Sequence, residues 1–315
     1  MKSHLLFWKQ KKKLRWKAHE PRPSSEKIFK KERSGVKEKE LMLTSILGCS
    51  RTDLYAKDVV LTPDQEQKLI QMQKRRKQGE PLQYILGECD FIGIPIKVDE
   101  RVFIPRPETE ILVDAIIERI KQFSKDYCIL DLGTGSGNIA VSLAKYVPRS
   151  TIDAVDISFG ALEVAKENAK KNNVGNKIHF IHADMIDYLE NVSRKEKYDV
   201  IVSNPPYIPS SQIGLLPEDV RREPQVALNG GFDGLEFYRI IIKNSVKTLK
   251  EDGFLFFEMG DGQKNALEMI FDQSECFRHL HFIKDYTKVD RIVVARKIVL
   301  KDSKSQEDEI SLTKN

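Results

Sequence analysis

The sequence lacks the features of secreted, zinc-binding and membrane-spanning chains. It has four cysteines, Cys49, Cys89, Cys128 and Cys276. They are widely spaced and include no CxxC pair, which argues against a disulfide framework or a zinc site and fits a reducing compartment. No apolar run approaches the roughly 20 residues that a helix needs to cross a bilayer. We therefore expect a soluble protein with no membrane partner.

A net positive charge is also missing from the body of the chain. The formal net charge is +5, but residues 1–40 carry +9 and residues 41–315 carry −4. A mildly acidic body does not predict a general nucleic-acid-binding surface, so we expect no stable nucleic-acid binding from it.

The first 38 residues form a basic leader. Residues 1–38 lack the apolar core and the small-residue cleavage site of a secretory signal. Their composition favours a solvated, disordered tail, with an organellar targeting sequence or an RNA-contacting arm as the alternatives. A second charged tail is expected over 301–315.

A small helical module is predicted over residues 39–87, followed by a linker over 88–108. Gly48 stands where a helix-ending glycine is common, and a second helix begins with Thr62 as N-cap and Pro63 in its first turn. Within the linker, "DFIGIPIKVD" predicts a short β-hairpin.

Strands alternate with helices from residue 109 to residue 300. A helix is predicted over "ETEILVDAIIERIKQF", and strands over "YCILDLG", "STIDAVDIS", "KIHFIHAD", "YDVIVSN", "GFLFFEMG" and "RIVVARKIV". Apolar, β-branched strands separated by helical segments indicate βαβ units. The predicted fold class is therefore α/β, a doubly wound, mostly parallel sheet covered on both faces.

A glycine-rich turn follows the first of these strands. Gly133, Gly135 and Gly137 stand in "DLGTGSGN", ahead of a helix, where backbone N–H groups can approach a ligand. The dinucleotide fingerprint GxGxxG would need glycine at position 138, which is Asn138. The turn therefore does not predict a nicotinamide site.

Acidic residues stand at the ends of three successive strands. Asp156 ends the second strand, 25 residues beyond Asp131, where a carboxylate can accept hydrogen bonds from both ribose hydroxyls. Asp184 ends the third. Each acid alone has a helix-capping or turn role as its alternative, but together they predict a ligand site on one edge of the sheet.

The spacing D-x-G-x-G-x-G resembles motif I of the class I S-adenosylmethionine-dependent methyltransferases. The resemblance implies a Rossmann-like domain, S-adenosyl-L-methionine as methyl donor and no metal. It implies cofactor contacts from Asp131, Gly133, Thr134, Gly135, Gly137, Asp156, Ile157, Asp184, Met185 and Asn204.

The fourth strand ends in "NPPY", residues 204–207. This tetrapeptide is similar to the acceptor motif of methyltransferases that act on planar –NH₂ groups: adenine, cytosine or the glutamine amide. The Asn204 side-chain oxygen and the Pro205 carbonyl can accept hydrogen bonds from such a group, and Tyr207 offers it a flat face. The expected catalytic residues are Asn204, Pro205, Pro206 and Tyr207.

The segment "GEPLQYILG…IPRPETE" narrows the choice of acceptor. With "EPQVALNGGFDGLEFYR" and "FEMGDGQ", it resembles the release-factor glutamine methyltransferases (the HemK/PrmC family) over roughly residues 40–298. The resemblance implies methylation of N5 of the glutamine in the Gly-Gly-Gln loop of class I peptide-chain release factors. It places Phe103 and Pro105 beside NPPY in the substrate pocket, and the helical module on the substrate protein.

The front of the chain departs from the family, which usually begins with an amphipathic helix and a longer bundle, so the module is expected to be abbreviated or divergent.

Glu258 is a candidate supporting group, with a capping or turn role as its alternative. An adenine or cytosine methyltransferase and a non-catalytic S-adenosylmethionine-binding module are the rival functions. We expect a cytoplasmic monomer, with the mitochondrial matrix as the alternative compartment.

Overall fold

The computed structural model describes residues 27–56, 59–121, 125–191 and 197–298. The chain divides into two compact units, one ending at Lys77 and one beginning at Gln78. The sequence predicts that the helical module ends at residue 87, ten residues beyond the end of this compact unit. No helix within the described ranges is long and apolar enough to cross a membrane.

The N-terminal unit consists of three helices, α2 (Lys27–Leu47), α3 (Arg51–Ala56) and α4 (Pro63–Lys77). The start of α2 corrects the predicted leader, because residues 27–38 are helical. That stretch is rich in lysine, arginine and glutamate, which favour helices without needing an apolar face. The rest of the predicted leader, 1–26, and the tail, 301–315, lie outside the described residues.

Local signals in the N-terminal unit act as expected. Helix α2 stops before Gly48, whose φ is +62°. Thr62 and Gln65 form a capping box at α4: each side chain accepts a hydrogen bond from the other residue's backbone N–H, at 3.3 and 2.9 Å. Helix α4 packs on α2, and the Arg76 guanidinium makes two 3.0 Å hydrogen bonds to Glu38.

The larger unit begins with α5 (Leu82–Leu86) and the predicted hairpin, β1 (Glu88–Phe91) and β2 (Ile94–Lys97). Its remaining elements are α6 (Pro107–Ile120), β3 (Tyr127–Leu132), α7 (Asn138–Tyr146), β4 (Ser150–Asp156), α8 (Phe159–Lys171), η1 (Gly175–Lys177), β5 (Ile178–His182), α9 (Met185–Asn191), β6 (Tyr198–Ser203), η2 (Ser210–Leu215), α10 (Glu218–Arg221), η3 (Gln225–Ala227), α11 (Glu236–Thr248), β7 (Leu249–Glu258), α12 (Lys264–Ser274), β8 (Phe277–Lys284) and β9 (Asp290–Lys297).

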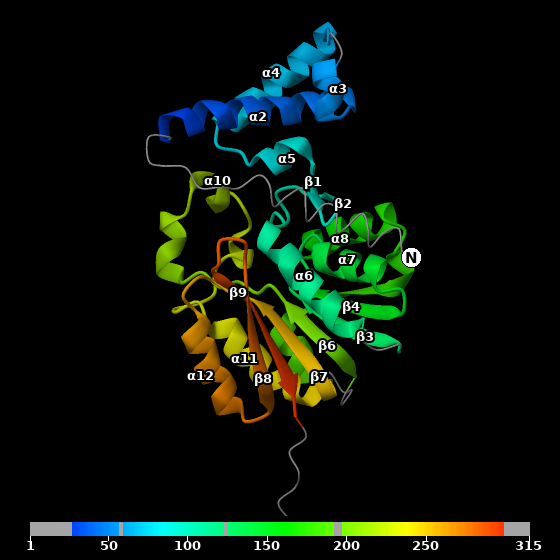
Figure 1. Ribbon diagram of the computed structural model, residues 1–315, viewed down its shortest axis with the longest axis vertical. Coiled ribbons are helices and arrows are strands. Elements are labelled where there is room, and N and C mark those ends of the chain that lie inside the picture. Colours follow the sequence, from blue (N-terminus) through cyan, green and yellow to red (C-terminus); the bar gives the residue numbers. More distant parts are fainter. Residues whose placement is uncertain (1–26, 57–58, 122–124, 192–196, 299–315) are drawn as a thin grey trace, which may run out of the picture. The chain divides into compact units, whose positions relative to one another are not determined.

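One seven-stranded sheet organises the larger unit, in the order β5-β4-β3-β6-β7-β9-β8 (Figure 1). The five strands from β5 to β7 are parallel, whereas β9 and β8 pair antiparallel. The predicted α/β class with a mostly parallel sheet is confirmed.

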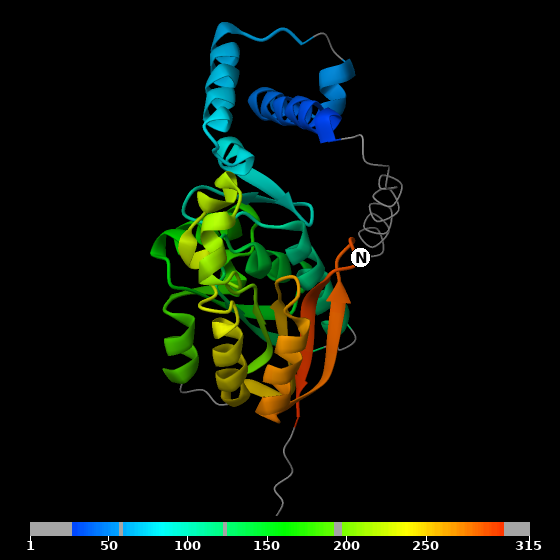
Figure 2. The same cartoon turned by 90° about the vertical axis from the view of Figure 1, so that its left-hand side faces the viewer.

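Helices cover both faces of this sheet. Helices α6, α7 and α8 pack against one another, and α11 packs against α9 and α12. Figure 2 shows α11 and α12, in yellow and orange, together on one side of the sheet. The core between them is aromatic: the rings of Tyr238 and Phe257 meet edge to face at 5.3 Å, and both side chains are fully buried.

Strand β8 is the one element of the sheet that we did not predict. Its sequence, "FRHLHFIK", mixes apolar and polar residues without a regular alternation, and its side chains alternate only in part between the buried and the exposed face. The backbone of His279 has a φ of +54°, and the pairing with β9 shifts register between Arg278 and His281. This irregularity interrupts the two-residue period by which a strand is recognised in a sequence.

The register brings the expected site residues to one edge of the sheet. Leu132 at the end of β3 pairs with Ser203 at the end of β6, and Ser203 pairs with Phe257 of β7. The chain runs outward from β3 to β5 on one side and returns to β6 on the other, so β3 and β6 flank the topological switch point. Open α/β sheets bind ligands beyond the carboxyl ends of their strands at such a point.

Candidate active site

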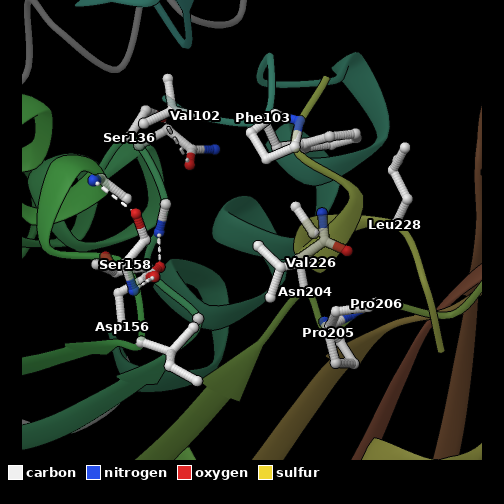
Figure 3. A pocket seen from close by; sticks show the side chains of 18 of the residues that line it. Val102, Phe103, Ser136, Asp156, Ser158, Asn204, Pro205, Pro206, Val226 and Leu228 are labelled. Atoms are coloured by element: carbon white, nitrogen blue, oxygen red, sulfur yellow. Dashed lines mark hydrogen bonds between the residues drawn. The ribbon is translucent and has the colours of Figure 1, made fainter. Parts of the chain in front are cut away.

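A cavity of about 350 Å³ lies at this edge of the larger unit. Its walls include most of the residues expected from the sequence: Phe103, Pro105, Gly133, Thr134, Gly135, Asp156, Ile157, Asp184, Met185, Asn204, Pro205, Pro206 and Tyr207. Figure 3 shows two groups of side chains facing each other across it. Ser136, Asp156 and Ser158 form one side, which we call the donor half. Phe103, Asn204 and the two prolines stand in the other, the acceptor half.

Asp131 and Gly137 do not line the cavity, and the direct cofactor contact expected for them stays a prediction. The side chain of Asp131 is fully buried; its Oδ2 accepts a 2.6 Å hydrogen bond from the Thr134 hydroxyl, and its Oδ1 has no hydrogen-bond partner among the described residues. Burial raises the pKa of Asp131 to about 7. Gly137 precedes α7 with a φ of +77°, and a Cβ there would lie 2.9 Å from the Cβ of Ala165. Both residues shape the turn from behind.

Asp156 is held by backbone donors. Its Oδ2 accepts a 2.8 Å hydrogen bond from Gly135 N–H, and its Oδ1 accepts one of 2.8 Å from Ser158 N–H. Burial raises its pKa, and these two N–H groups act in the opposite direction. A carboxylate has about four lone-pair positions, so two remain for hydroxyl groups in the cavity.

Asp184 and Met185 form the far end of the donor half. Asp184 Oδ1 accepts a 2.7 Å hydrogen bond from Ile186 N–H at the start of α9, so the helix-capping alternative is realised while the residue still lines the cavity. Ile157, half exposed, and Met185 add apolar surface. A glycine turn that lets the backbone approach a ligand closely, carboxylates that accept hydroxyls and an apolar slot fit a nucleoside-bearing methyl donor.

Asn204 begins the acceptor half, directly after β6. Its Nδ2 donates a 3.3 Å hydrogen bond to Thr109 Oγ1, and the Thr109 hydroxyl donates one of 2.6 Å to Glu258 Oε2. Within the described residues no hydrogen bond reaches Asn204 Oδ1. The amide oxygen is therefore left as an acceptor beside the cavity that Asn204 lines.

Glu258 is buried beneath this pair, with 1% of its surface exposed. Burial raises its pKa to about 7, against the hydrogen bond from Thr109, which lowers it. Its other oxygen lies 3.5 Å from the Tyr207 hydroxyl. Burial of the Tyr207 side chain likewise holds its pKa well above its usual range.

Two glycine-containing loops hold the NPPY turn. Gln263 Nε2 donates to the carbonyls of Tyr207 and Gly234, at 3.0 and 3.1 Å, and its Oε1 accepts from Gly260 N–H at 2.9 Å. Gly230 lies so close that a Cβ there would stand 2.7 Å from the Pro206 carbonyl oxygen. The segments "GGFDG" and "MGDGQ" thus fix the shape of the acceptor turn through close backbone approach.

The linker forms another wall of the acceptor half. Arg106 pairs with Glu223, which is 1% exposed and also accepts a 2.9 Å hydrogen bond from Ile104 N–H. The Arg106 guanidinium lies over the Phe103 ring, 4.6 Å from its centroid. This ion pair connects "IPRPETE" to the segment after NPPY, and so fixes Phe103 and Pro105 on the cavity.

Sequence reasoning missed several lining residues. Thr109, Ser136, Asn138 and Ser158 add polar groups, and Val220, Pro224, Val226, Ala227, Leu228 and Phe237 add apolar surface. Ser136, Asn138 and Ser158 adjoin residues that we had selected, so proximity to motif I could have found them. Most of the apolar set lies in "EPQVALNGGFDGLEFYR", a segment that carries the family resemblance but has no periodicity to show which side chains line a cavity.

Metal chemistry has no candidate ligand cluster in the described parts of the chain. His182 Nε2 lies 2.9 Å from the Ile157 carbonyl oxygen, and its ring meets Phe159 edge to face. His179 contacts Asp153 at 3.1 Å. Both histidines have packing or hydrogen-bonding roles.

Comparison with known proteins defines the class. Residues 107–215 match the family model of the methyltransferase small domain, and residues 26–87 match that of the PrmC N-terminal domain. The hMettl16 catalytic domain, solved in complex with a 3′UTR hairpin, has the same fold, with a TM-score of 0.50 at 15% identity over 77% of this chain and 84% of that one. The fold and the cavity are those of a methyltransferase.

Curated relatives specify the family. The release factor glutamine methyltransferase of Thermodesulfovibrio yellowstonii is 39% identical over 264 residues, 83% of this chain and 92% of the relative. That of Moorella thermoacetica is 38% identical over 259 residues, 82% of this chain and 90% of the relative. The chain belongs to the release factor glutamine methyltransferase family. Because the N-terminal match begins at residue 26, the helical module begins earlier than the expected residue 39.

Proposed function

We propose that this protein methylates the side-chain amide nitrogen, N5, of the glutamine in the Gly-Gly-Gln loop of class I peptide-chain release factors. The observation that carries the proposal is the position of Asn204. Among the described residues no hydrogen bond reaches its amide oxygen, and Asn204 lines a cavity that the glycine turn and Asp156 also line. The names of the curated relatives supply the substrate class.

An amide nitrogen is a poor nucleophile because its lone pair is delocalised into the carbonyl group. The protein therefore has to orient the –NH₂ rather than activate it with a strong base. Asn204 Oδ1 and the Pro205 carbonyl accept its two hydrogen bonds and fix the plane of the amide. Tyr207 provides the flat surface against which the planar group rests.

S-adenosyl-L-methionine, when bound, supplies a methyl group already activated by a sulfonium. Asp156 and Asp184 would hold its hydroxyl and amino groups, and the turn at Gly133 and Gly135 would receive its polar end. Phe103, Pro105 and Tyr207 exclude water from the acceptor half. In such an environment fixed hydrogen-bond acceptors act more strongly than they would in water.

The helical unit serves recognition in this proposal. The match of residues 26–87 to the PrmC N-terminal domain supports a role in holding the release factor. Release factors act where translation takes place, so we assign the protein to the cytoplasm, with the mitochondrial matrix as the alternative. No observation on the described residues favours a nucleic-acid base as acceptor or a non-catalytic module.

The test is mass spectrometry of a release factor incubated with this protein and S-adenosyl-L-methionine. We expect the Gly-Gly-Gln peptide to gain the mass of one methylene group, with the fragment ions placing it on glutamine. A release factor with Gly-Gly-Glu in that loop is the matched control and should gain nothing. Methylated adenine or cytosine in a parallel nucleic-acid reaction, with an unmodified glutamine, would refute the proposal.

A further inference from the structure

Two buried polar residues outside the expected catalytic motif lie directly behind it. Thr109, in the first turn of α6, and Glu258, at the end of β7, are each 1% exposed. They connect to Asn204 in a single line: Asn204 Nδ2 to Thr109 Oγ1 at 3.3 Å, and Thr109 Oγ1 to Glu258 Oε2 at 2.6 Å.

The direction of the protons in this line is fixed by chemistry. An ionised carboxylate can only accept hydrogen bonds, so the single O–H group of Thr109 donates to Glu258. Thr109 can then only accept from its other neighbour. The neighbouring atom of Asn204 must be a donor, which is Nδ2 and not Oδ1. The carboxylate therefore selects one of the two orientations of the Asn204 amide, which differ by half a turn about its last bond.

We propose that Thr109 and Glu258 are positioning residues that keep the Asn204 amide oxygen directed at the acceptor –NH₂. This inference rests on the proposed function and deepens it. In the reverse orientation Asn204 would present its own –NH₂ to that of the glutamine, and two donors would face each other. The line thus decides whether the NPPY motif can accept a hydrogen bond from its substrate.

Glu258 also reaches the other end of the motif. Its Oε1 lies 3.5 Å from the Tyr207 hydroxyl, and its backbone carbonyl accepts a 2.9 Å hydrogen bond from Tyr238. One carboxylate thus contacts both Tyr207 and, through Thr109, Asn204. The strand register explains how it reaches both, because Ser203 pairs with Phe257 and the next residues along the two strands are Asn204 and Glu258.

Packing alone does not account for these residues. A buried carboxylate is costly to desolvate, and an apolar pair of the same volume would serve a purely structural role as well or better. The charged groups that act on Glu258 from outside the line are Glu108 and Arg291, which oppose each other. The hydrogen bond from Thr109 is the largest favourable contribution to its ionised form.

The test compares Thr109→Val with Thr109→Ser in the full-length protein. Valine keeps the shape of threonine and removes the hydroxyl, so we expect kcat for release-factor methylation to fall about 10- to 100-fold. Serine keeps the hydroxyl, and kcat should stay within about threefold. The dissociation constant for S-adenosyl-L-methionine, measured by titration calorimetry, should change less than about twofold in both.

Two further variants separate positioning from folding. Thr248→Val makes the same change at another residue that is 1% exposed, whose hydroxyl donates to Ser245 O, and should leave kcat unchanged. Thr109→Val leaves the Glu258 carboxylate without its donor, which can cost stability. The double variant Thr109→Val/Glu258→Met removes both polar groups, and should melt like the wild type yet stay as slow as Thr109→Val.

Each outcome has a defined meaning. Normal turnover by a folded Thr109→Val protein would overturn the proposal, as would recovery of turnover in the double variant. A parallel loss of methyl-donor affinity would show a collapsed cavity and would overturn it too. Failure of the proposed function itself is distinguishable, because then the wild type would not methylate the glutamine at all.

Discussion

The two halves of the cavity are built in different ways. In the donor half, the central carboxylate of Asp156 is held by backbone N–H groups of Gly135 and Ser158. In the acceptor half, Asn204 is held by side chains from residues 109 and 258. The first arrangement depends on the course of the main chain through two strand ends, whereas the second depends on particular side chains far apart in sequence.

Because of this difference, substitutions should affect the two halves of the cavity in different ways. Replacing a side chain leaves backbone donors in place, so the donor half should tolerate changes at residues that neither contact the ligand nor shape the turn as Asp131 and Gly137 do. The acceptor half should lose its geometry when any member of its side-chain network changes. The methyl donor and the glutamine are therefore expected to respond to different sets of variants.

The largest predicted effects come from one substitution in each half of the cavity. Asn204→Ala removes an acceptor aimed at the reacting group and should lower kcat about 10²- to 10³-fold, with donor affinity nearly unchanged. Asp156→Ala should instead weaken S-adenosyl-L-methionine binding about 10- to 100-fold, as expected for loss of charge-assisted hydrogen bonds. Single-turnover kinetics and titration calorimetry measure the two quantities. Equal loss of both in either variant would contradict a division into halves.

The next effect concerns the ion pair that holds the linker wall. Arg106→Ala leaves the Glu223 carboxylate buried without its cation. Because the Arg106 side chain is 29% exposed, we expect a cost of about 2 kcal/mol in unfolding free energy, below that of a fully buried pair. The KM for the release factor should rise about tenfold through displacement of Phe103, with little change for the methyl donor.

Chemical denaturation and steady-state kinetics measure these changes. The control is Arg106→Ala/Glu223→Gln, in which the buried charge is gone. It should recover most of the stability, but its KM should stay high, since no ion pair holds the linker in place. Recovery of both would show that the ion pair acts on stability alone.

The donor half was readable from the sequence because its signals are local. Each glycine and acid stands beside the end of an apolar strand that is visible in the sequence, although Gly135 and the Asp156 carboxylate that it contacts are 21 residues apart. The NPPY motif was found for the same reason. The partners that orient it were not, because Thr109 and Glu258 are 149 residues apart and meet where α6 packs against β7. We placed Glu258 at the correct edge but could not assign its contacts.

The elements of the fold divide in the same way. The buried parallel strands were predicted from their apolar runs, as was the hairpin at residues 88–97. The edge strand β8 was not, because its mixed sequence and its irregularity at His279 hide the alternation. The start of α2 was missed since lysine and glutamate form helices without an apolar face to mark them.

A smaller effect is expected from Glu258→Gln, and its sign differs between activity and stability. The folded-state pKa of Glu258 is raised to about 7 by burial, so the carboxyl group stabilises the fold most below its ordinary pKa. That contribution is lost as the pH rises through about 7, because the ionised form is penalised inside the protein. Glutamine avoids this penalty, so the variant should gain about 2 to 3 kcal/mol over the wild type at pH 8 relative to pH 5.

Turnover should respond in the opposite direction. In the wild type, kcat should fall as the pH decreases through about 7, since a protonated Glu258 no longer obliges Thr109 to donate to it. Glu258→Gln should be slower at pH 8 and lack this acidic limb. A variant that is both less stable and less active at pH 8, with the limb intact, would mean that Glu258 is only a packing residue.

The smallest effect is predicted for Ser158→Ala, in the donor half. Ser158 caps α8 by accepting a 3.1 Å hydrogen bond from Ala161 N–H, while its own backbone N–H holds Asp156. Alanine removes the cap and keeps the backbone donor, so unfolding free energy should fall by about 1 kcal/mol and donor affinity by less than about threefold. Thermal denaturation and calorimetry report the two changes. A large loss of affinity would mean that the Asp156 carboxylate depends on the Ser158 side chain after all, and the contrast with the acceptor half would fail, since both halves would then be held by side chains.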